Sequence, residues 1–263
     1  MDLGLKGKRA IVMGGSEGLG KASAVALARD GASVVICARR EEPLRATVAE
    51  LQKLTPGKVK GVRADVASAS DLACLFEEAV AEMGGLDILV TNSGGPPPGF
   101  FMDFDDRAWQ DAFNLVVMSN VRAIRLAIPH LERAGGGSIV NIVSTSVKQP
   151  IQNLVLSNSL RMAVVGLAKT LAQQYAPKGI RVNNVLPGSM ATARIHKLTE
   201  NRAAQRGIPF EQAWKEREKE VPMGRIGDPM DLGNAVAFLA SPAAGYVTGA
   251  TLQVDGGVVQ YVM

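Results

Sequence analysis

The stretch Gly14-Gly15-Ser16-Glu17-Gly18-Leu19-Gly20 follows the apolar run 10–13 and opens a helical pattern that extends to residue 30. Glycines let the backbone approach a phosphate closely, and the N–H groups and dipole of a helix N-terminus favour an anion. Strand, glycine turn and helix in this order are therefore typical of a pyrophosphate site. The spacing G-x-x-x-G-x-G differs from the G-x-G-x-x-G fingerprint, and clustered glycines also occur in ordinary turns. We expect this turn, with Ser16 among its residues, to bind a cofactor that carries a pyrophosphate.

Length and composition limit the classes of protein to be considered. The chain has 263 residues, of which 47% are hydrophobic, and a formal net charge of +4. We predict a single domain over 1–263, because α/β chains of this size often fold as one. The charge is small and dispersed, and no apolar run reaches the roughly 18 residues of a membrane span. The first residues lack the basic and apolar parts of a secretory signal, so we expect a cytoplasmic protein without nucleic-acid or membrane partners.

The two cysteines, Cys37 and Cys74, each lie within an apolar pattern. We therefore predict that both are buried thiols and neither metal ligands nor a disulfide pair. Nothing in the sequence indicates a metal site.

Apolar runs of strand length alternate with helical patterns along almost the whole chain. The predicted strands are 9–13, 33–37, 59–63, 87–91, 138–143, 181–185 and 251–254, and the predicted helices are 19–30, 41–54, 70–83, 106–132, 153–176 and 229–240. The strands are rich in Val and Ile on both faces, which is typical of strands buried between two helix layers. Strand–helix alternation implies right-handed crossovers. We predict an α/β fold: a Rossmann-type, doubly wound parallel sheet of about seven strands.

One segment, 190–225, interrupts this alternation. Seven of the ten residues 211–220 are charged. The segment could be a solvated helix pair or a mobile lid over a substrate site, because loops at the carboxyl ends of strands carry function in such folds. The sequence does not decide between them.

The residues after the second predicted strand bear on nucleotide choice. An acidic residue there would accept hydrogen bonds from a free ribose 2′-hydroxyl, whereas an arginine would pair with a 2′-phosphate. Ala38 and Arg39 occupy this place, so NADP(H) is favoured over NAD(H). Glu17 in the glycine turn argues the other way, since its charge would repel a phosphate, and Arg39 could also be an ordinary surface arginine.

Asp65-Val66 follow the third predicted strand, Thr91-Asn92-Ser93-Gly94-Gly95 the fourth, and Pro187-Gly188-Ser189-Met190-Ala191-Thr192 the sixth. Together these stretches resemble the short-chain dehydrogenase/reductase family over essentially the whole chain. The chain looks like the 3-oxoacyl-carrier-protein reductases, and 246–257 resembles the closing strand and oligomer-forming tail. The resemblance implies that Gly14, Gly18, Leu19 and Gly20 hold the pyrophosphate, and that Asp65, Val66, Asn92, Gly94, Pro187, Gly188 and Thr192 contact other parts of the cofactor. Met13 and Thr91 depart from the family pattern, which bears on how the turn is braced and not on the fold.

The resemblance fails at the active site. The family uses a serine after the fifth strand, a Tyr-x-x-x-Lys pair on the next helix and often an asparagine on the helix before. Ser144 stands at the serine position, but Ser157 and Arg161 replace the tyrosine and lysine, and Val116 replaces the asparagine. Residues 157 and 161 share one helix face. Arg161 can still bind ribose hydroxyls, but the very high pKa of an ordinary guanidinium would prevent it from releasing a proton at neutral pH. Losing a general acid costs about 10²–10⁴ in rate.

These substitutions leave several functions open. The first is an oxidoreductase that acts on a small carbonyl or alcohol with an altered proton route, Ser144 polarising the oxygen. The second is a dinucleotide-binding protein with little turnover, a sensor or partner subunit; a lyase or isomerase is a third. Lys148 could supply a proton if it faced the site, whereas His130 and His196 look structural. By resemblance we expect a homotetramer or homodimer.

Overall fold

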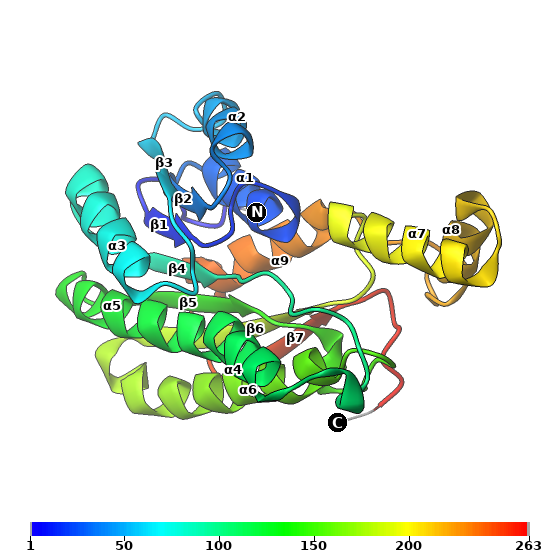
Figure 1. The fold of residues 1–263 in the computed structure, drawn as a ribbon. Coiled ribbons are helices and arrows are strands. Elements are labelled where there is room, and N and C mark those ends of the chain that lie inside the picture. Colours follow the sequence, from blue (N-terminus) through cyan, green and yellow to red (C-terminus); the bar gives the residue numbers. More distant parts are fainter. Residues whose placement is uncertain (1, 262–263) are drawn as a thin grey trace.

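The computed structural model describes residues 2–261, which form one parallel sheet with the strand order β3-β2-β1-β4-β5-β6-β7 (Figure 1). The strands are β1 (Arg9–Val12), β2 (Ser33–Ala38), β3 (Val59–Arg63), β4 (Ile88–Thr91), β5 (Gly137–Ile142), β6 (Ile180–Pro187) and β7 (Thr251–Val254). Every neighbouring pair is parallel. The predicted doubly wound α/β sheet of seven strands is confirmed.

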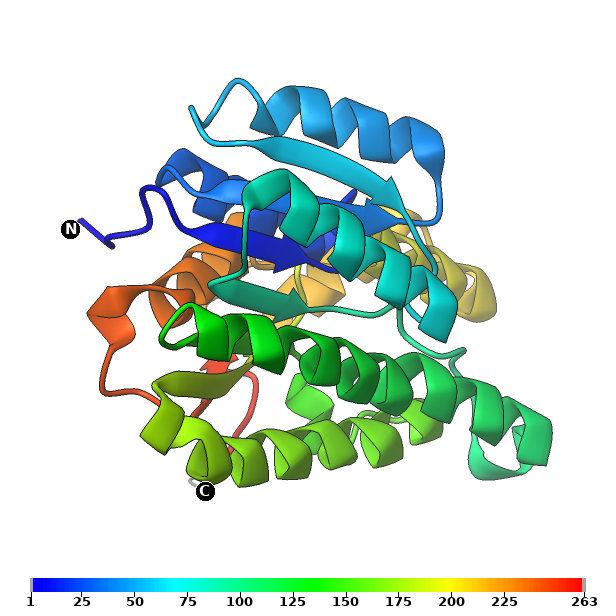
Figure 2. The same cartoon turned by 90° about the vertical axis from the view of Figure 1, so that its left-hand side faces the viewer.

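Helices connect the strands and cover both faces of the sheet (Figure 2). They are α1 (Gly18–Arg29), α2 (Glu41–Leu51), α3 (Ala69–Met83), α4 (Asp106–Phe113), α5 (Ser119–Arg133), α6 (Val155–Tyr175), α7 (Ala193–Arg206), α8 (Phe210–Lys219) and α9 (Pro229–Ala240). In the described part of the chain, no helix is both long enough and apolar enough to cross a bilayer.

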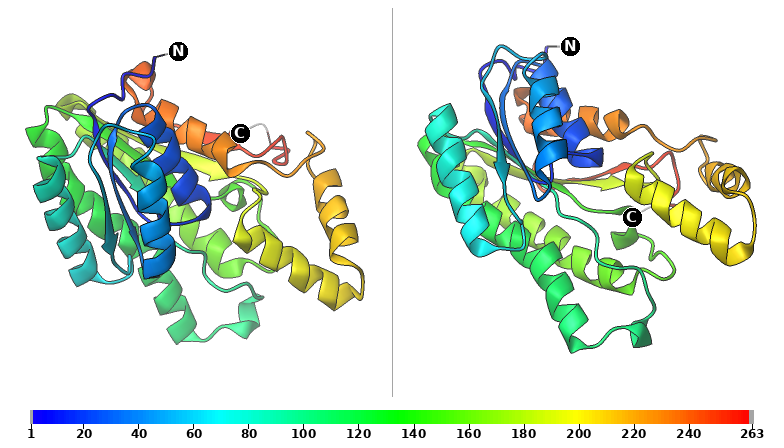
Figure 3. Two further views of the ribbon diagram at one scale, coloured as in Figure 1. Left: turned by 90° about the horizontal axis from the view of Figure 1, so that it is seen from above. Right: turned by 45° about the horizontal axis from the view of Figure 1, so that its top comes forward.

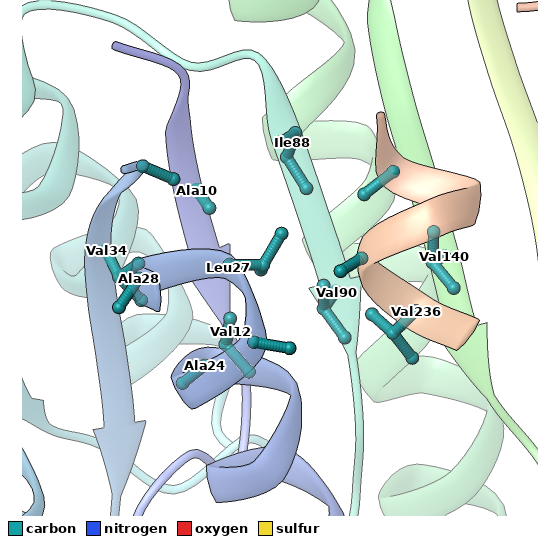
Figure 4. Packing of buried hydrophobic residues seen from close by; sticks show 14 of the residues in the cluster. Ala10, Val12, Ala24, Leu27, Ala28, Val34, Ile88, Val90, Val140 and Val236 are labelled. Carbon is teal, nitrogen blue, oxygen red and sulfur yellow. The ribbon is translucent and has the colours of Figure 1, made fainter. Parts of the chain in front are cut away.

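Two hydrophobic clusters lie on opposite faces of the sheet. In β1, Ala10 and Val12 belong to the cluster under α1 and α9, whereas Ile11 and Met13 belong to the cluster under α3 and α5. This alternation follows from the two-residue period of a strand. Figure 4 shows the first cluster, where Leu27 of α1 and Val236 of α9 pack against the strands. Because helices cover both faces of the sheet, neither face of a strand needs polar side chains, and the strand sequences are nearly continuous apolar runs.

The winding direction reverses beside β1. This strand pairs with β2 on one side and with β4 on the other. The chain therefore adds β2 and β3 on one side of β1, crosses back, and then adds β4 to β7 in order on the other side. β1 and β4 stay hydrogen-bonded up to their carboxyl ends, but the chain leaves them for opposite halves of the sheet, and open α/β sheets bind ligands in the crevice at such a reversal.

Two predictions about local structure are wrong. The continuous helix predicted for 106–132 is interrupted by a π-helical turn, η2 (Asn114–Met118), between α4 and α5. The apolar periodicity continues through this turn, so the sequence pattern hides it. Cys37 is buried as predicted, but Cys74 is exposed and lies near Glu78 on the outer face of α3. Leu72, Leu75 and Phe76 form the buried face of that helix instead.

The segment 190–225 forms the helix pair α7 and α8, which extends away from the sheet (Figures 1 and 3). Its own small aromatic cluster holds it together. The His196 ring lies 4.5 Å from that of Trp214 and 5.9 Å from that of Phe210, measured between ring centroids. Ion pairs of Arg202 and Arg206 with Glu216 join the two helices.

Candidate active site

A cleft of about 1520 Å³ opens at the carboxyl edge of the sheet. Segments after all seven strands line it, and residues of α7 close its side. The structure brings nearly all predicted site residues together on its wall: Gly14, Ser16, Gly18, Leu19, Arg39, Asp65, Val66, Asn92, Gly94, Ser144, Ser157, Arg161, Pro187, Gly188 and Thr192. Gly20 is the exception, because it lies buried beneath the turn.

The glycine turn is built so that side chains cannot enter it. Gly14 and Gly18 have φ of 58° and 54°, values that favour glycine. A Cβ on Gly20 would lie 2.0 Å from the carbonyl oxygen of Gly14, so Gly20 lets α1 start directly against the turn. Glu17 precedes α1 without capping it through its side chain. The first N–H groups of α1 therefore remain able to bind an anion, and the turn fits the pyrophosphate of a dinucleotide.

Arginines surround the nucleotide end of the cleft. Arg40 forms an ion pair with Glu17, so the acidic residue in the turn is neutralised. Arg39 lines the cleft beside it and forms no ion pair with any other described residue. Asp65 uses a carboxylate oxygen to accept a hydrogen bond from the backbone N–H of Ala67, 3.0 Å away. The repulsion that the sequence predicted for Glu17 is thus offset by Arg40.

Ser144 stands at the end of β5 with its hydroxyl directed by the following turn, η3 (Thr145–Val147). The backbone N–H of Ser146 donates to Ser144 Oγ over 3.1 Å. Since a hydroxyl has one proton to donate, this bond leaves the Ser144 O–H available to a ligand. Thr145 Oγ1 donates to the carbonyl of Pro187 (3.2 Å), which ties the turn to the end of β6.

Ser157 and Arg161 form a linked pair on the first turns of α6. Arg161 Nε donates to Ser157 Oγ over 3.0 Å, and Nη1 donates to the carbonyl of Val143 over 2.8 Å. Ser157 is buried, and its O–H remains free to donate because the oxygen accepts from the guanidinium. Burial, together with the nearby charge of Arg194, lowers the pKa of Arg161 to about 10. The expectation of an ordinary arginine pKa is therefore corrected downward, although the group stays cationic at neutral pH.

Val116 offers the site nothing polar. It is buried in the core within the π-helical turn, and its carbonyl accepts from Asn120 Nδ2 over 2.7 Å. Its neighbour Leu115 lines the cleft instead.

Three other side chains weighed from the sequence lie away from the cleft wall. Lys148 does not line it, His196 packs in the aromatic cluster of α7 and α8, and His130 contacts Arg133 at the end of α5. Burial, and then the charge of Arg133, lower the pKa of His130.

The sequence reasoning missed the loop before α6. Asn153 lines the cleft with φ of 61°, a conformation that asparagine tolerates better than most residues. Its carbonyl accepts from the N–H of Gly99 over 2.7 Å, and Asn158 binds both backbone groups of Ile151. These bonds hold the loops after β4 and β5 together. Asn153 and Asn158 themselves were the only features of the sequence that could have indicated this loop.

The reasoning also missed Arg194. Its Nη atoms point to the carbonyls of Gly95 and Pro96 at 3.4 and 3.3 Å. A contact between the loop after β4 and α7 joins residues nearly a hundred positions apart, which no local pattern predicts.

Comparison with known proteins agrees with this geometry. The family model described as "Enoyl-(Acyl carrier protein) reductase" matches residues 14–259. The 7alpha-hydroxysteroid dehydrogenase of Escherichia coli (strain K12) is 34% identical over 259 residues, covering 98% of this chain and 97% of that protein. Dehydrogenase/reductase SDR family member 4 of Sus scrofa is 36% identical over 255 residues, covering 96% of this chain and 88% of its own length.

A solved structure shows the same architecture with ligands bound. L-sorbose reductase from Gluconobacter frateurii, complexed with NADPH and L-sorbose, superposes with a TM-score of 0.95 at 31% identity over 100% of both chains. This chain therefore belongs to the short-chain dehydrogenase/reductase family, and it is an oxidoreductase that uses a nicotinamide dinucleotide to interconvert alcohols and carbonyl compounds.

Proposed function

We propose that the protein is an NADP(H)-dependent reductase of a small carbonyl compound whose proton route runs through Ser157 and Arg161. The linked geometry of these two residues carries the proposal, because it offers a donor where the family has its tyrosine. The bound nicotinamide would supply the hydride. The rest of the chemistry falls to side chains of this chain.

Arg39 supports the choice of NADP(H), since its guanidinium lines the nucleotide end and is not engaged by an acidic residue between positions 2 and 261. A planar guanidinium suits a 2′-phosphate. Gly14, Gly18, Leu19 and Gly20 would hold the pyrophosphate, Thr192 the nicotinamide side of the cofactor, and Arg161 the nicotinamide ribose. Changing Arg39 to Gln should weaken NADPH binding more than NADH binding.

The hydroxyls of Ser144 and Ser157 and the guanidinium of Arg161 would contact the carbonyl oxygen of the substrate. Ser144 and Ser157 each have an O–H to donate, and the charge of Arg161 stabilises negative charge that develops on the oxygen. As the oxygen becomes an alkoxide it takes the proton of Ser157, and Ser157 takes the Nε proton of Arg161 through their 3.0 Å hydrogen bond. Water in the open cleft then returns a proton to Arg161. The lowered pKa of Arg161 makes this transfer easier than for an exposed arginine.

Turnover of NADPH with a panel of ketones, aldehydes and oxo acids tests the proposal. Ser144→Ala and Ser157→Ala should each lower kcat/KM by about 10²–10⁴ with NADPH binding unchanged. Ser159→Ala, an exposed serine on the same helix, is the matched control and should keep full activity. The wild-type rate should fall as the pH rises through about 10, because Arg161 then loses its proton.

A different result would favour a binding protein over an enzyme. Tight NADPH binding without turnover in the wild type, together with turnover gained in Ser157→Tyr/Arg161→Lys, would reject the proton route.

The setting of the enzyme is also part of the proposal. We place α7 and α8 as a lid that closes on substrate, because Leu198, Asn201 and Gln205 of α7 line the cleft.

We place the protein in the cytoplasm as a single-domain homotetramer or homodimer. The exposed apolar side chains Phe113 and Met162 on α4 and α6, and Phe238 and Leu252 on α9 and β7, support association. A monomer in light scattering would reject it.

A further inference from the structure

The cleft carries more positive charge than its own acidic residues neutralise. Its wall contains the arginines Arg39, Arg40, Arg161, Arg194, Arg202 and Arg217, but only three acidic side chains, Glu17, Asp65 and Glu220. Arg40 pairs with Glu17, and Arg202 pairs with Glu220. At the substrate end, Arg161 and Arg194 form no ion pair with any residue from 2 to 261.

Arg194 is held in place by weak, neutral partners. Its Nη1 and Nη2 lie 3.4 and 3.3 Å from the carbonyl oxygens of Gly95 and Pro96. A guanidinium has five N–H donors, so most of its donors stay unused. A Cβ on Gly95 would lie 2.4 Å from Arg194 Cζ, which shows how closely the guanidinium packs on the loop after β4. The guanidinium is thus positioned on this loop and keeps N–H donors that a ligand could use.

The two unpaired arginines also disfavour one another. Arg194 is an exposed residue whose pKa is lowered by partial burial, and its charge adds to the lowering of the pKa of Arg161. Two like charges that act on one another without a counter-ion are unfavourable, and a bound anion would offset their repulsion. Phe100 and Ile151, both exposed, line the same cleft and offer apolar contact to the rest of a ligand.

We propose that Arg194 binds a carboxylate on the substrate, so that the enzyme acts on oxo acids with an apolar body. The inference rests on the proposed carbonyl reduction, with the carbonyl at Ser144 and Ser157 and the carboxylate at Arg194. The cofactor is the competing source of anionic groups. The N–H groups of α1 and Arg39 would take its pyrophosphate and 2′-phosphate in the proposed arrangement, which would leave Arg194 for the substrate.

Ligand binding to the NADPH-saturated enzyme tests this without requiring turnover. The probes are phenylacetate and 4-phenylbutanoate, each compared with its neutral primary amide in a thermal-shift or calorimetric titration. The acids should bind more tightly than the amides in the wild type. Arg194→Gln should weaken binding of the acids by about tenfold to a hundredfold and leave the amides unchanged.

Two variants control for general effects. Arg202→Gln removes an arginine from the same helix face that is already paired with Glu216 and Glu220, so it should keep the preference for acids. Arg194→Lys should retain part of it. The thermal unfolding of each unliganded variant checks folding, and the wild-type comparison of acid with amide depends on no variant.

Three outcomes decide the matter. Equal binding of acids and amides to the wild type would overturn the inference. So would a tenfold loss of NADPH affinity in Arg194→Gln with the acid preference intact, since Arg194 would then serve the cofactor. The third outcome combines two results: acids bind more tightly than amides only when Arg194 is present, and the protein reduces no oxo compound. This outcome would support the anion site and reject the proposed reductase activity.

Discussion

At the scale of single residues, a buried chain of hydrogen bonds crosses the carboxyl half of the sheet. Thr91 Oγ1 donates to Asn141 Oδ1 (2.8 Å), Asn141 Nδ2 to Asn184 Oδ1 (3.0 Å), and Asn184 Nδ2 to Thr251 Oγ1 (3.1 Å). The chain links β4, β5, β6 and β7 just below the site. Thr91 thus supplies a donor with a small hydroxyl where family resemblance implies an asparagine.

We predict that Thr91→Val lowers the free energy of unfolding by about 1–3 kcal/mol, because it leaves the fully buried Asn141 Oδ1 without a donor. Thr91→Ser keeps the hydroxyl and should cost clearly less. Urea unfolding at neutral pH measures both. A larger loss in Thr91→Ser, which lacks only the methyl group, than in Thr91→Val, which lacks only the hydroxyl, would mean that the methyl group matters and the hydrogen bond does not.

How far the site could be predicted also depends on individual residues. The turn from Gly14 to Gly20 could be found from the sequence because glycine spacing is local, whereas Ser144, Ser157 and Arg161 were placed by resemblance to the family's active-site positions. Arg194 was not, since its contact with Gly95 arises only when the loop after β4 meets α7. The lowered pKa of Arg161 likewise depends on burial, and the sequence does not show burial quantitatively.

At the scale of elements, the start of β1 is fastened to the start of β4 by one ion pair. Arg9 Nε and Nη2 donate to the two oxygens of Asp87 over 2.7 and 3.1 Å, and the Arg9 backbone N–H adds a third bond. Burial alone would raise the pKa of Asp87, but these bonds and the charge of Arg9 outweigh it and hold the pKa below its usual value. The Asp87 side chain is 14% exposed.

Asp87→Asn should therefore destabilise the protein by about 1–3 kcal/mol near neutral pH. The folded pKa of Asp87 is lowered, so the stabilisation is complete above the unfolded pKa of about 4 and disappears as the pH falls through the folded pKa. Urea midpoints of wild type and variant should converge in acid. A difference that stays constant with pH would contradict the assignment.

The junction between the glycine turn and α1 gives a second prediction at this scale. Gly20→Ala should abolish dinucleotide binding and lower stability, because the new Cβ would lie 2.0 Å from the Gly14 carbonyl. Gly166→Ala is the matched control: nothing lies within 4 Å of its Cβ position in α6. It should raise stability by about 0.5–1 kcal/mol. Fluorescence titration with NADPH and thermal unfolding test both, and unchanged binding in Gly20→Ala would refute the proposed turn geometry.

The element boundaries show where pattern reasoning ends. Strand–helix alternation predicted each strand to within a few residues, since buried strands and amphipathic helices have different periods. The π-helical turn between α4 and α5 shifts the helix register by one residue and leaves the apolar pattern intact. It also places Val116 in the core and Leu115 on the cleft, which a continuous helix would not reveal.

At the scale of the whole molecule, the reversal between β1 and β4 gathers distant segments into one cleft. Topology alone thus explains why residues from 14 to 194 meet there. The fold was predictable because connection rules admit few topologies for alternating strands and helices. The outward reach of α7 and α8 was not, because a charged segment has no partner that the sequence identifies.

The most direct test of the account is a calorimetric titration of the wild-type protein with NADPH. Ketones, aldehydes and oxo acids are then added one at a time to the same complex. The account predicts saturable one-to-one binding of NADPH, tighter than that of NADH, and oxidation of the bound NADPH by at least one carbonyl compound. If neither NADPH nor NADH binds, the account is contradicted, because no ligand would then explain the arrangement of the glycine turn, Arg39 and Arg161.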